Sequence, residues 1–168
     1  VQTPGPWTTD SGVINITNSK NLTLTGLTAK NEYQYQAVVS DVDVQSSTAV
    51  NISWSHNVTL ENATLAGNGK STVWIQGNST VEIRDTSVDC YYFCLGIAAS
   101  DVQTKNLTVS QFNSVSTVDR HAMFWVSSTM RAAVDNAFYG NSNVVFEDTT
   151  IQKKTGEGMV AGNGGYSY

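Results

Sequence analysis

The sequence predicts an all-β protein whose short strands recur along the chain as the turns of a solenoid. Thr, Val, Ser and Asn dominate, and no window keeps an apolar period of about 3.6 residues over three helical turns. A two-strand motif also recurs, with starts 22 to 37 residues apart. Repeats of this length favour a solenoid over a two-sheet sandwich. An antiparallel β-sandwich or jelly roll is the alternative, because alternating short strands also build those folds.

The repeated unit consists of two strands and two polar corners. Its main strand has a polar start, an apolar-polar-apolar triplet, a short polar turn and a further apolar residue. Examples are KNLTLTGLTA (20–29), HNVTLENATLA (56–66), NSTVEIRDTSV (78–88), KNLTVSQFNSV (105–115) and SNVVFEDTTIQ (142–152). A second short strand precedes several of them, as in GVINIT (12–17), AVNISW (49–54), STVWIQ (71–76) and AMFWVS (122–127). Strand alternation then predicts that Ile16, Val58 and Leu107 face the core.

This pattern resembles the right-handed parallel β-helix of the pectate-lyase-like superfamily, from about Gly12 to Ile151. The resemblance implies coils of roughly 20–25 residues. The longer gaps then predict insertions, such as NEYQYQAVVSDVDVQSS at 31–47. The best candidate for a helix is TMRAAVDNAF at 129–138, which is short.

Composition limits the classes of protein. The 168 residues suit one domain, and the hydrophobic fraction of 40% suits a real core. Only 14% of residues are charged, so Ser, Thr, Asn and Gln must supply most of the polar surface. The net charge is −5 and the nine Lys and Arg are scattered, which argues against nucleic acid as a partner. No apolar stretch approaches the roughly 20 residues that span a bilayer, so we expect no membrane span.

The two ends of the sequence favour export and assembly. The chain starts VQTPGPW without an initiator Met, which we interpret as a processed terminus. We expect one β domain over residues 1–168, with an extended arm or cap at 1–12 and a Gly-rich tail at 155–168. The end coils of a solenoid expose unpaired backbone and apolar surface unless they are covered. Self-association is therefore the expected partnership, with head-to-tail stacking into a filament as one form of it.

Seven N-x-S/T sequons predict N-glycosylation, which would place the chain outside the cell. They begin at Asn15, Asn21, Asn51, Asn57, Asn62, Asn78 and Asn106. Alternating polarity in a strand also produces N-x-T, because Asn and Thr then share the outward face. Seven is roughly twice the number that 15 Asn and 38 Ser or Thr give by chance. The low charge favours glycans, because a charge-poor β surface needs another protection against edge pairing.

The two cysteines, Cys90 and Cys94, predict a local disulfide in an exported protein. Their C-x3-C spacing is typical neither of metal sites nor of redox motifs. Residues four apart in one strand lie about 13 Å apart, so the bond requires the chain to fold back. Two buried free thiols are the alternative.

Catalytic chemistry has few candidates. Asp119, Arg120 and His121 form a D-R-H cluster that could act as an acid-base group or bind a substrate, although a charged turn is the simpler interpretation. The segment 131–151 resembles pectin methylesterases, a resemblance that would make Asp135 the nucleophile. The family's Q-D-T and L-G-R-P-W elements have no match in this sequence. We expect no cofactor and no metal.

Acidic and aromatic residues supply the remaining candidates. Asp41 and Asp43 share a strand face that could bind calcium or act on a polysaccharide, with two solvated acids as the alternative. Glu61, Asp85 and Asp148 are expected in one column, with neutral residues or a cation between them to limit repulsion. Trp54, Trp74 and Trp125 would form a ladder if they stack, but core packing is the default expectation.

We therefore expect a non-catalytic, glycosylated extracellular structural or adhesive protein at the cell surface, with a self-assembling filament or cell-envelope subunit as its form. The alternative is a polysaccharide-binding or polysaccharide-degrading protein of the pectate-lyase-like class. Asp135, Asp119, Arg120 and His121 are the residues to mutate under that alternative.

Overall fold

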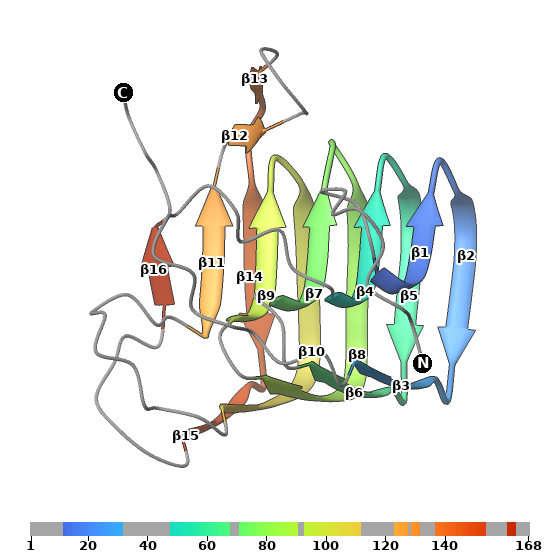
Figure 1. The fold of residues 1–168 in the computed structure, drawn as a ribbon, viewed down its shortest axis with the longest axis vertical. Helices are drawn as coiled ribbons and strands as arrows, with labels where there is room; N and C mark the ends of the chain where they lie inside the picture. Colours follow the sequence, from blue (N-terminus) through green and yellow to red (C-terminus); the bar gives the residue numbers. More distant parts are fainter. Residues whose placement is uncertain are drawn as a thin grey trace.

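Two large parallel sheets build the molecule. The computed structural model describes residues 12–31, 48–67, 71–90, 93–111, 123–127, 129–131, 137–153 and 161–163. These residues form 16 strands and, within the same ranges, no helix. Figure 1 shows the two sheets facing each other, with blue N-terminal strands at one end of the stack and orange and red C-terminal strands at the other. None of the described segments is a helix long and apolar enough to span a membrane.

The first sheet has six strands, and their order in space follows their order in the chain. They run in the order β1-β4-β7-β9-β11-β16. Their bounds are β1 Gly12–Thr17, β4 Thr48–Ser53, β7 Ser71–Gln76, β9 Phe93–Ala98, β11 Phe124–Ser127 and β16 Ala161–Asn163. Each strand therefore lies beside its counterpart from the neighbouring repeat.

The second sheet contains the strands that follow the first-sheet strand within each repeat. Its main path is β14-β10-β8-β5-β2, with β3 pairing β6, β6 also pairing β8, and β15 pairing β10. The bounds are β2 Lys20–Thr25, β3 Thr28–Asn31, β5 His56–Glu61, β6 Thr64–Gly67, β8 Thr80–Cys90, β10 Asp101–Gln111, β14 Asn143–Glu147 and β15 Thr150–Lys153. We number the repeats 1 to 5 by the residues 12–31, 48–67, 71–90, 93–111 and 123–153.

All strand pairs of both large sheets are parallel. The antiparallel sandwich or jelly roll is therefore wrong for these sheets. The expected helix at 129–138 is wrong as well, because β12 (Thr129–Arg131) and β13 (Ala137–Tyr139) pair as an antiparallel ribbon. Thr129 is β-branched and Phe138 and Tyr139 are aromatic, and residues of these types favour extended backbone over a short isolated helix.

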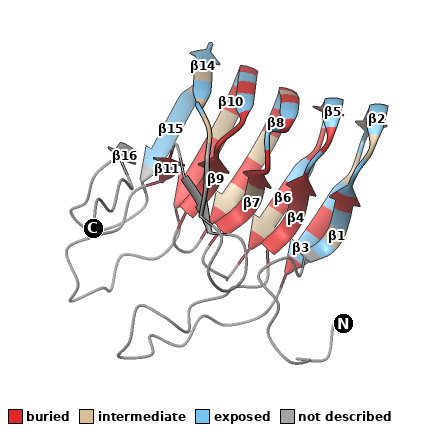
Figure 2. Cartoon of the chain, turned by 90° about the horizontal axis from the view of Figure 1, so that it is seen from above, coloured by how far each residue is buried: buried red, intermediate tan, exposed pale blue. Residues whose placement is uncertain are grey.

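The core lies between the sheets and consists of stacked apolar columns. One column of the first sheet contains Ile16, Ile52, Ile75 and Ile97, joined by direct register. A column of the second sheet contains Leu22, Val58, Val81, Val102 and Val144. Ile16 is 5% exposed, Val58 1% and Leu107 0%, so the predicted inward orientation of these three residues is confirmed. Figure 2 shows the buried residues concentrated in the middle repeats.

A disulfide closes the corner between repeats 3 and 4. Cys90 ends β8 and Cys94 lies in β9, so the chain turns between them from the second sheet to the first. Their Cα atoms are 4.9 Å apart, and the sulfurs are bonded. Both residues are fully buried against the core.

The two end repeats are more exposed than the middle ones. Val13 in repeat 1 is 44% exposed, and Val145, Phe146 and Ile151 in repeat 5 are 47%, 40% and 41% exposed. Among the described residues, Trp54 is the other large hydrophobic residue with comparable exposure. Phe146 and Ile151 continue the inward columns of the second sheet, so apolar surface that is buried inside the stack reaches solvent at its end.

Candidate functional site

The corner within the second sheet is the most regular polar feature of the surface. At this corner each repeat places one residue in the left-handed backbone conformation. The residues and their φ angles are Gly26 (69°), Asn62 (53°), Asp85 (47°), Asn106 (51°) and Asp148 (49°). The strand register aligns all five in one column, which we call the corner column. Gly, Asn and Asp are the residues that tolerate this conformation best, which explains the choice at each position.

The expected acidic column is only partly correct. Asp85 and Asp148 do share the corner column, and Asn106 separates them as the predicted neutral residue. Glu61 lies one position earlier, in register with Arg84. Because successive side chains along a strand point to opposite faces, the Glu61 side chain points in a different direction from that of Asp85. Comparing the two sequence motifs could not show this offset of one residue.

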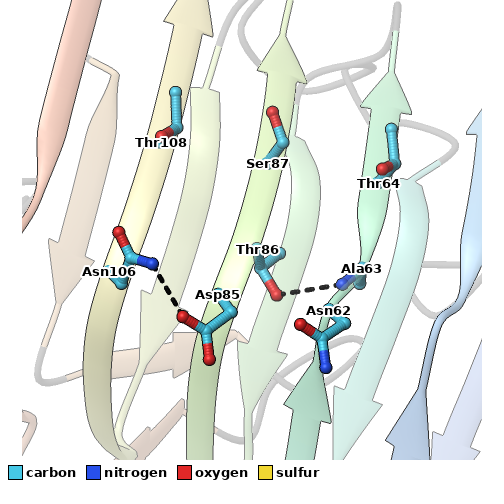
Figure 3. A pocket seen from close by; sticks show the side chains of 8 residues that line it. All are labelled: Asn62, Ala63, Thr64, Asp85, Thr86, Ser87, Asn106 and Thr108. Carbon is cyan, nitrogen blue, oxygen red and sulfur yellow. Dashed lines mark hydrogen bonds between the residues drawn. The ribbon is translucent and has the colours of Figure 1, made fainter.

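Hydrogen bonds connect neighbouring repeats within the corner column and immediately beside it. The Asn106 side-chain nitrogen donates to Oδ1 of Asp85 at 2.7 Å, and the Ala63 backbone N–H donates to the Thr86 hydroxyl at 3.4 Å. Figure 3 shows both bonds, of which the first is exposed and the second is buried. A carboxylate that accepts from a neutral amide avoids the repulsion that a column of carboxylates alone would cause.

A shallow open depression lies over this corner in repeats 2 to 4. Its volume is about 310 Å³, near the lower limit of ordinary ligand pockets. It is lined by Asn62, Ala63, Thr64, Asp85, Thr86, Ser87, Asn106 and Thr108 (Figure 3). Hydroxyl and amide groups therefore dominate the lining, which suits a hydroxyl-rich neutral ligand better than an apolar one.

The other corner, between the two sheets, contains a serine ladder that the sequence reasoning missed. The backbone N–H of each of the first four serines donates to the hydroxyl of the serine in the next repeat, with N–O distances of 3.1 to 3.3 Å. The ladder comprises Ser19, Ser55, Ser79, Ser100 and Ser142. Each of these serines immediately precedes a strand of the second sheet, so a Ser that recurs just before these strands was the available signal in the sequence.

The structure separates the seven sequons into distinct environments. Six of the asparagines are exposed, and Asn51 alone is buried, at 1% exposure. The Asn51 side chain donates to that of Asn15 at 3.4 Å, and Asn57 donates to Asn21 at 2.8 Å. Among the seven sequon asparagines, those in the left-handed conformation are Asn21, Asn57, Asn62, Asn78 and Asn106. Corner geometry therefore accounts for part of the sequon excess, since it selects Asn independently of any sugar.

Charge is segregated between the sheets. The strands of the first sheet contain no Asp, Glu, Lys, Arg or His. In the second sheet Arg84 pairs with Glu82 through two guanidinium nitrogens. This hydrogen bond, together with the negative charges of Glu82, Glu61 and Asp85, raises the pKa of the Arg84 guanidinium. Arg84 therefore stays cationic at every ordinary pH.

Two tryptophans pack over glycines of the next repeat. A Cβ built on Gly77 would lie 2.8 Å from Cδ2 and Cε2 of Trp54 and 3.1 Å from Nε1, so the indole lies across the glycine. A Cβ on Gly96 would overlap Cε3 and Cζ3 of Trp74. Trp54 is 41% exposed and has a φ of 53°, so its expected core position is wrong.

Trp74 and Trp125 stack on each other, although one repeat separates them. Their ring centroids are 5.2 Å apart with an interplanar angle of 22°. Gly96 occupies the register position between them. The missing side chain at Gly96 leaves the space in which the two indoles meet. Trp74 also donates from Nε1 to the Gln76 side chain at 2.8 Å.

The sequence-predicted catalytic candidates are not tested by the described residues. Asp119, Arg120, His121 and Asp135 lie outside the described residues, as do Asp41 and Asp43. Within the described ranges no group of three or more His, Cys, Asp or Glu is arranged to hold a metal ion. The polar groups that the structure does bring together are the corner column and the hydroxyls beside it.

Comparisons with known proteins leave the family open. No protein-family model matches the chain, and neither a curated protein nor a solved structure matches it significantly.

Proposed function

We propose that this protein is a non-catalytic, glycosylated extracellular structural or adhesive protein, built as a right-handed parallel β-helix of the pectate-lyase-like type. The repeats would be its coils. The parallel pairing of corresponding strands and the apolar inward columns support this architecture. The polar, charge-poor exterior supports an extracellular location, because N-linked glycans on exposed asparagines would supply hydration where charges are few.

The observation that carries the structural function is the apolar exposure of the two end repeats. In the described residues β2 pairs with β5 alone, and β14 pairs with β10 alone, so each has a free backbone edge. Phe146 and Ile151 add exposed apolar side chains to one of these edges. A parallel edge with apolar side chains is a template for a further strand, and a second copy of the chain is the partner that we propose for it.

Electron microscopy and sedimentation velocity of native material test this proposal. We expect filaments or concentration-dependent oligomers, because each added copy presents a new open edge. A protein that stays monomeric at high concentration would contradict the assembly. Neutral-glycan release and intact mass measured on the same preparation test the glycosylated exterior separately.

Polysaccharide binding is the second candidate, and Trp54 favours it. One face of its indole lies on Gly77 while 41% of the residue remains exposed. Exposed aromatic surface packs well against the C–H groups of a sugar ring, and the neighbouring first-sheet strands β4 and β7 have no charge to disfavour a neutral polymer. A glycan array with wild type and Trp54→Ala tests this function. Binding that Trp54→Ala abolishes would support it, and a blank array together with no release of reducing sugar would exclude it.

A further inference from the structure

The corner column repeats one sequence pattern in every repeat. A left-handed residue is followed, two positions later, by Ser or Thr. The pairs are Gly26 and Thr28, Asn62 and Thr64, Asp85 and Ser87, Asn106 and Thr108, and Asp148 and Thr150. The pattern becomes a sequon only where the first residue is Asn, which occurs in repeats 2 and 4. Repeats 1, 3 and 5 have Gly or Asp at the same position.

We propose that Asn62 and Asn106 carry N-linked glycans, which therefore project from every second repeat along one edge of the molecule. This inference rests on the proposed export through a glycosylating secretory route. Both asparagines are exposed and both line the depression over the corner. Neighbouring strands are about 4.8 Å apart, so two repeats separate the attachment points by roughly 10 Å. A branched glycan is wider than the distance between two neighbouring strands. Because Asp85 lies between the two asparagines and carries no glycan, the two glycans are separated by two strand spacings.

The chemistry of attachment is compatible with the observed hydrogen bond. The donor would be an oligosaccharide linked to a lipid pyrophosphate. The asparagine Nδ2 forms a bond to C1 of the first sugar while the bond from C1 to the pyrophosphate oxygen breaks. The amide loses one proton, and the lipid pyrophosphate leaves with the electron pair. Nδ2 keeps its second hydrogen, so Asn106 still has one N–H to donate to Asp85.

The floor of the depression suits the first sugar of each glycan. Thr64, Ser87 and Thr108 are in direct register across β6, β8 and β10, so their hydroxyls form a row beside the two asparagines. Figure 3 shows this row next to Asn62 and Asn106 on the same surface. Hydroxyls at strand spacing offer hydrogen-bond donors and acceptors to a sugar that the covalent bond already holds in place.

Site mapping on protein secreted from a glycosylating eukaryotic host tests the proposal. Peptide mass spectrometry after enzymatic deglycosylation in ¹⁸O water marks each occupied asparagine. We expect labels at Asn62 and Asn106 and no label at Asn51, whose side chain is buried. Thr64→Ala and Thr108→Ala should each remove one glycan while keeping the asparagine at its corner. Thr28→Ala is the matched control and should remove none, because Thr28 is exposed and in register with Thr64 but follows Gly26 and belongs to no sequon.

The outcomes distinguish the inference from the function on which it rests. Bare Asn62 and Asn106 beside an occupied Asn78 would overturn the inference and leave the glycosylated exterior intact. If all seven sequons are bare, the glycosylated exterior fails as well. D85N tests the spacing, because it completes a third sequon with Ser87. We expect secreted D85N to carry no more than two glycans on the corner column, and three at wild-type yield would refute the spacing argument.

Discussion

Single residues determine the packing of this protein where space is tight and where the strands turn at the corners. Gly96 is one such residue, since a side chain there would occupy the space of the Trp74 indole. The corner residues are another group, because they adopt a left-handed conformation that costs most L-residues about 1–2 kcal/mol. Both effects act through backbone and steric geometry, so both can be tested without knowing the function.

Gly96→Ala is expected to destabilise the protein by about 1–3 kcal/mol, because its Cβ overpacks the outer face of the first sheet against Trp74. Urea unfolding measures the change in free energy. In a Trp74→Ala background the same substitution should cost much less, since the clashing ring is gone. Equal costs in the two backgrounds would mean that the indole is not the obstacle.

Asn62→Ala and Asn62→Gly should differ in stability in protein made without glycosylation. Alanine at a φ of 53° is strained and should cost about 1 kcal/mol relative to Asn, whereas Gly should be close to neutral. Thermal unfolding followed by circular dichroism compares the two variants. A more stable Ala variant would refute the left-handed assignment of this corner.

At the scale of single elements, ladders of identical hydrogen bonds hold successive repeats in register. In the serine ladder the hydroxyl of Ser79 accepts from the Ser55 N–H and donates to the Gln76 carbonyl, at 3.1 and 2.6 Å. Ser79 is 1% exposed, so water cannot replace either bond without rearrangement. Buried backbone groups at a corner lack ladder partners of their own, and the serine side chains satisfy them.

Ser79→Ala should destabilise the protein by about 1–3 kcal/mol, because it leaves the Ser55 N–H buried without its acceptor. Guanidinium unfolding with an unchanged denaturant slope would show that the loss is one of stability. In protein made without glycosylation, Thr80→Ala is a suitable control, since Thr80 is the next residue and is exposed. If both variants lose the same stability, the ladder is not the cause.

For the whole molecule, the decisive feature is that the stack has two different ends. Repeat 1 contributes Lys20 and Lys30, and no acidic residue among its described residues, whereas repeat 5 contributes Glu147 and Asp148 together with Arg131 and Lys153, so its described charges cancel. Two copies of the N-terminal end would therefore repel weakly, and opposite ends would not. This difference favours head-to-tail association over the meeting of two N-terminal ends.

Variants at opposite ends distinguish these geometries. Val13→Glu and Ile151→Glu each place a charge at an exposed position, so both proteins should fold and each should be monomeric in sedimentation velocity. An equimolar mixture should form dimers, because each protein keeps one intact end that fits the other. Dimers in either variant alone would instead indicate contact between identical ends.

The all-β class and much of the core could be predicted from the sequence, because alternating polarity depends only on neighbouring residues. Ile16, Val58 and Leu107 were placed correctly for this reason. The parallel pairing could be favoured over an antiparallel one only by the length of the repeat, and the structure decided between them. The local pattern failed at the corners, where a left-handed residue breaks the alternation and turns Trp54 away from the face of Ile52.

The sequence by itself determined that short polar-faced strands recur, that asparagine and serine mark their ends, and that two nearby cysteines exist. Only the tertiary structure decided which recurrences become neighbours. Gly96 lies between Trp74 and Trp125, and Asp85 between Asn62 and Asn106, because strand register brings together residues from different repeats. The physical reason is that side-chain alternation is a local property of the chain, whereas a column is created by hydrogen bonds between strands about twenty to forty residues apart.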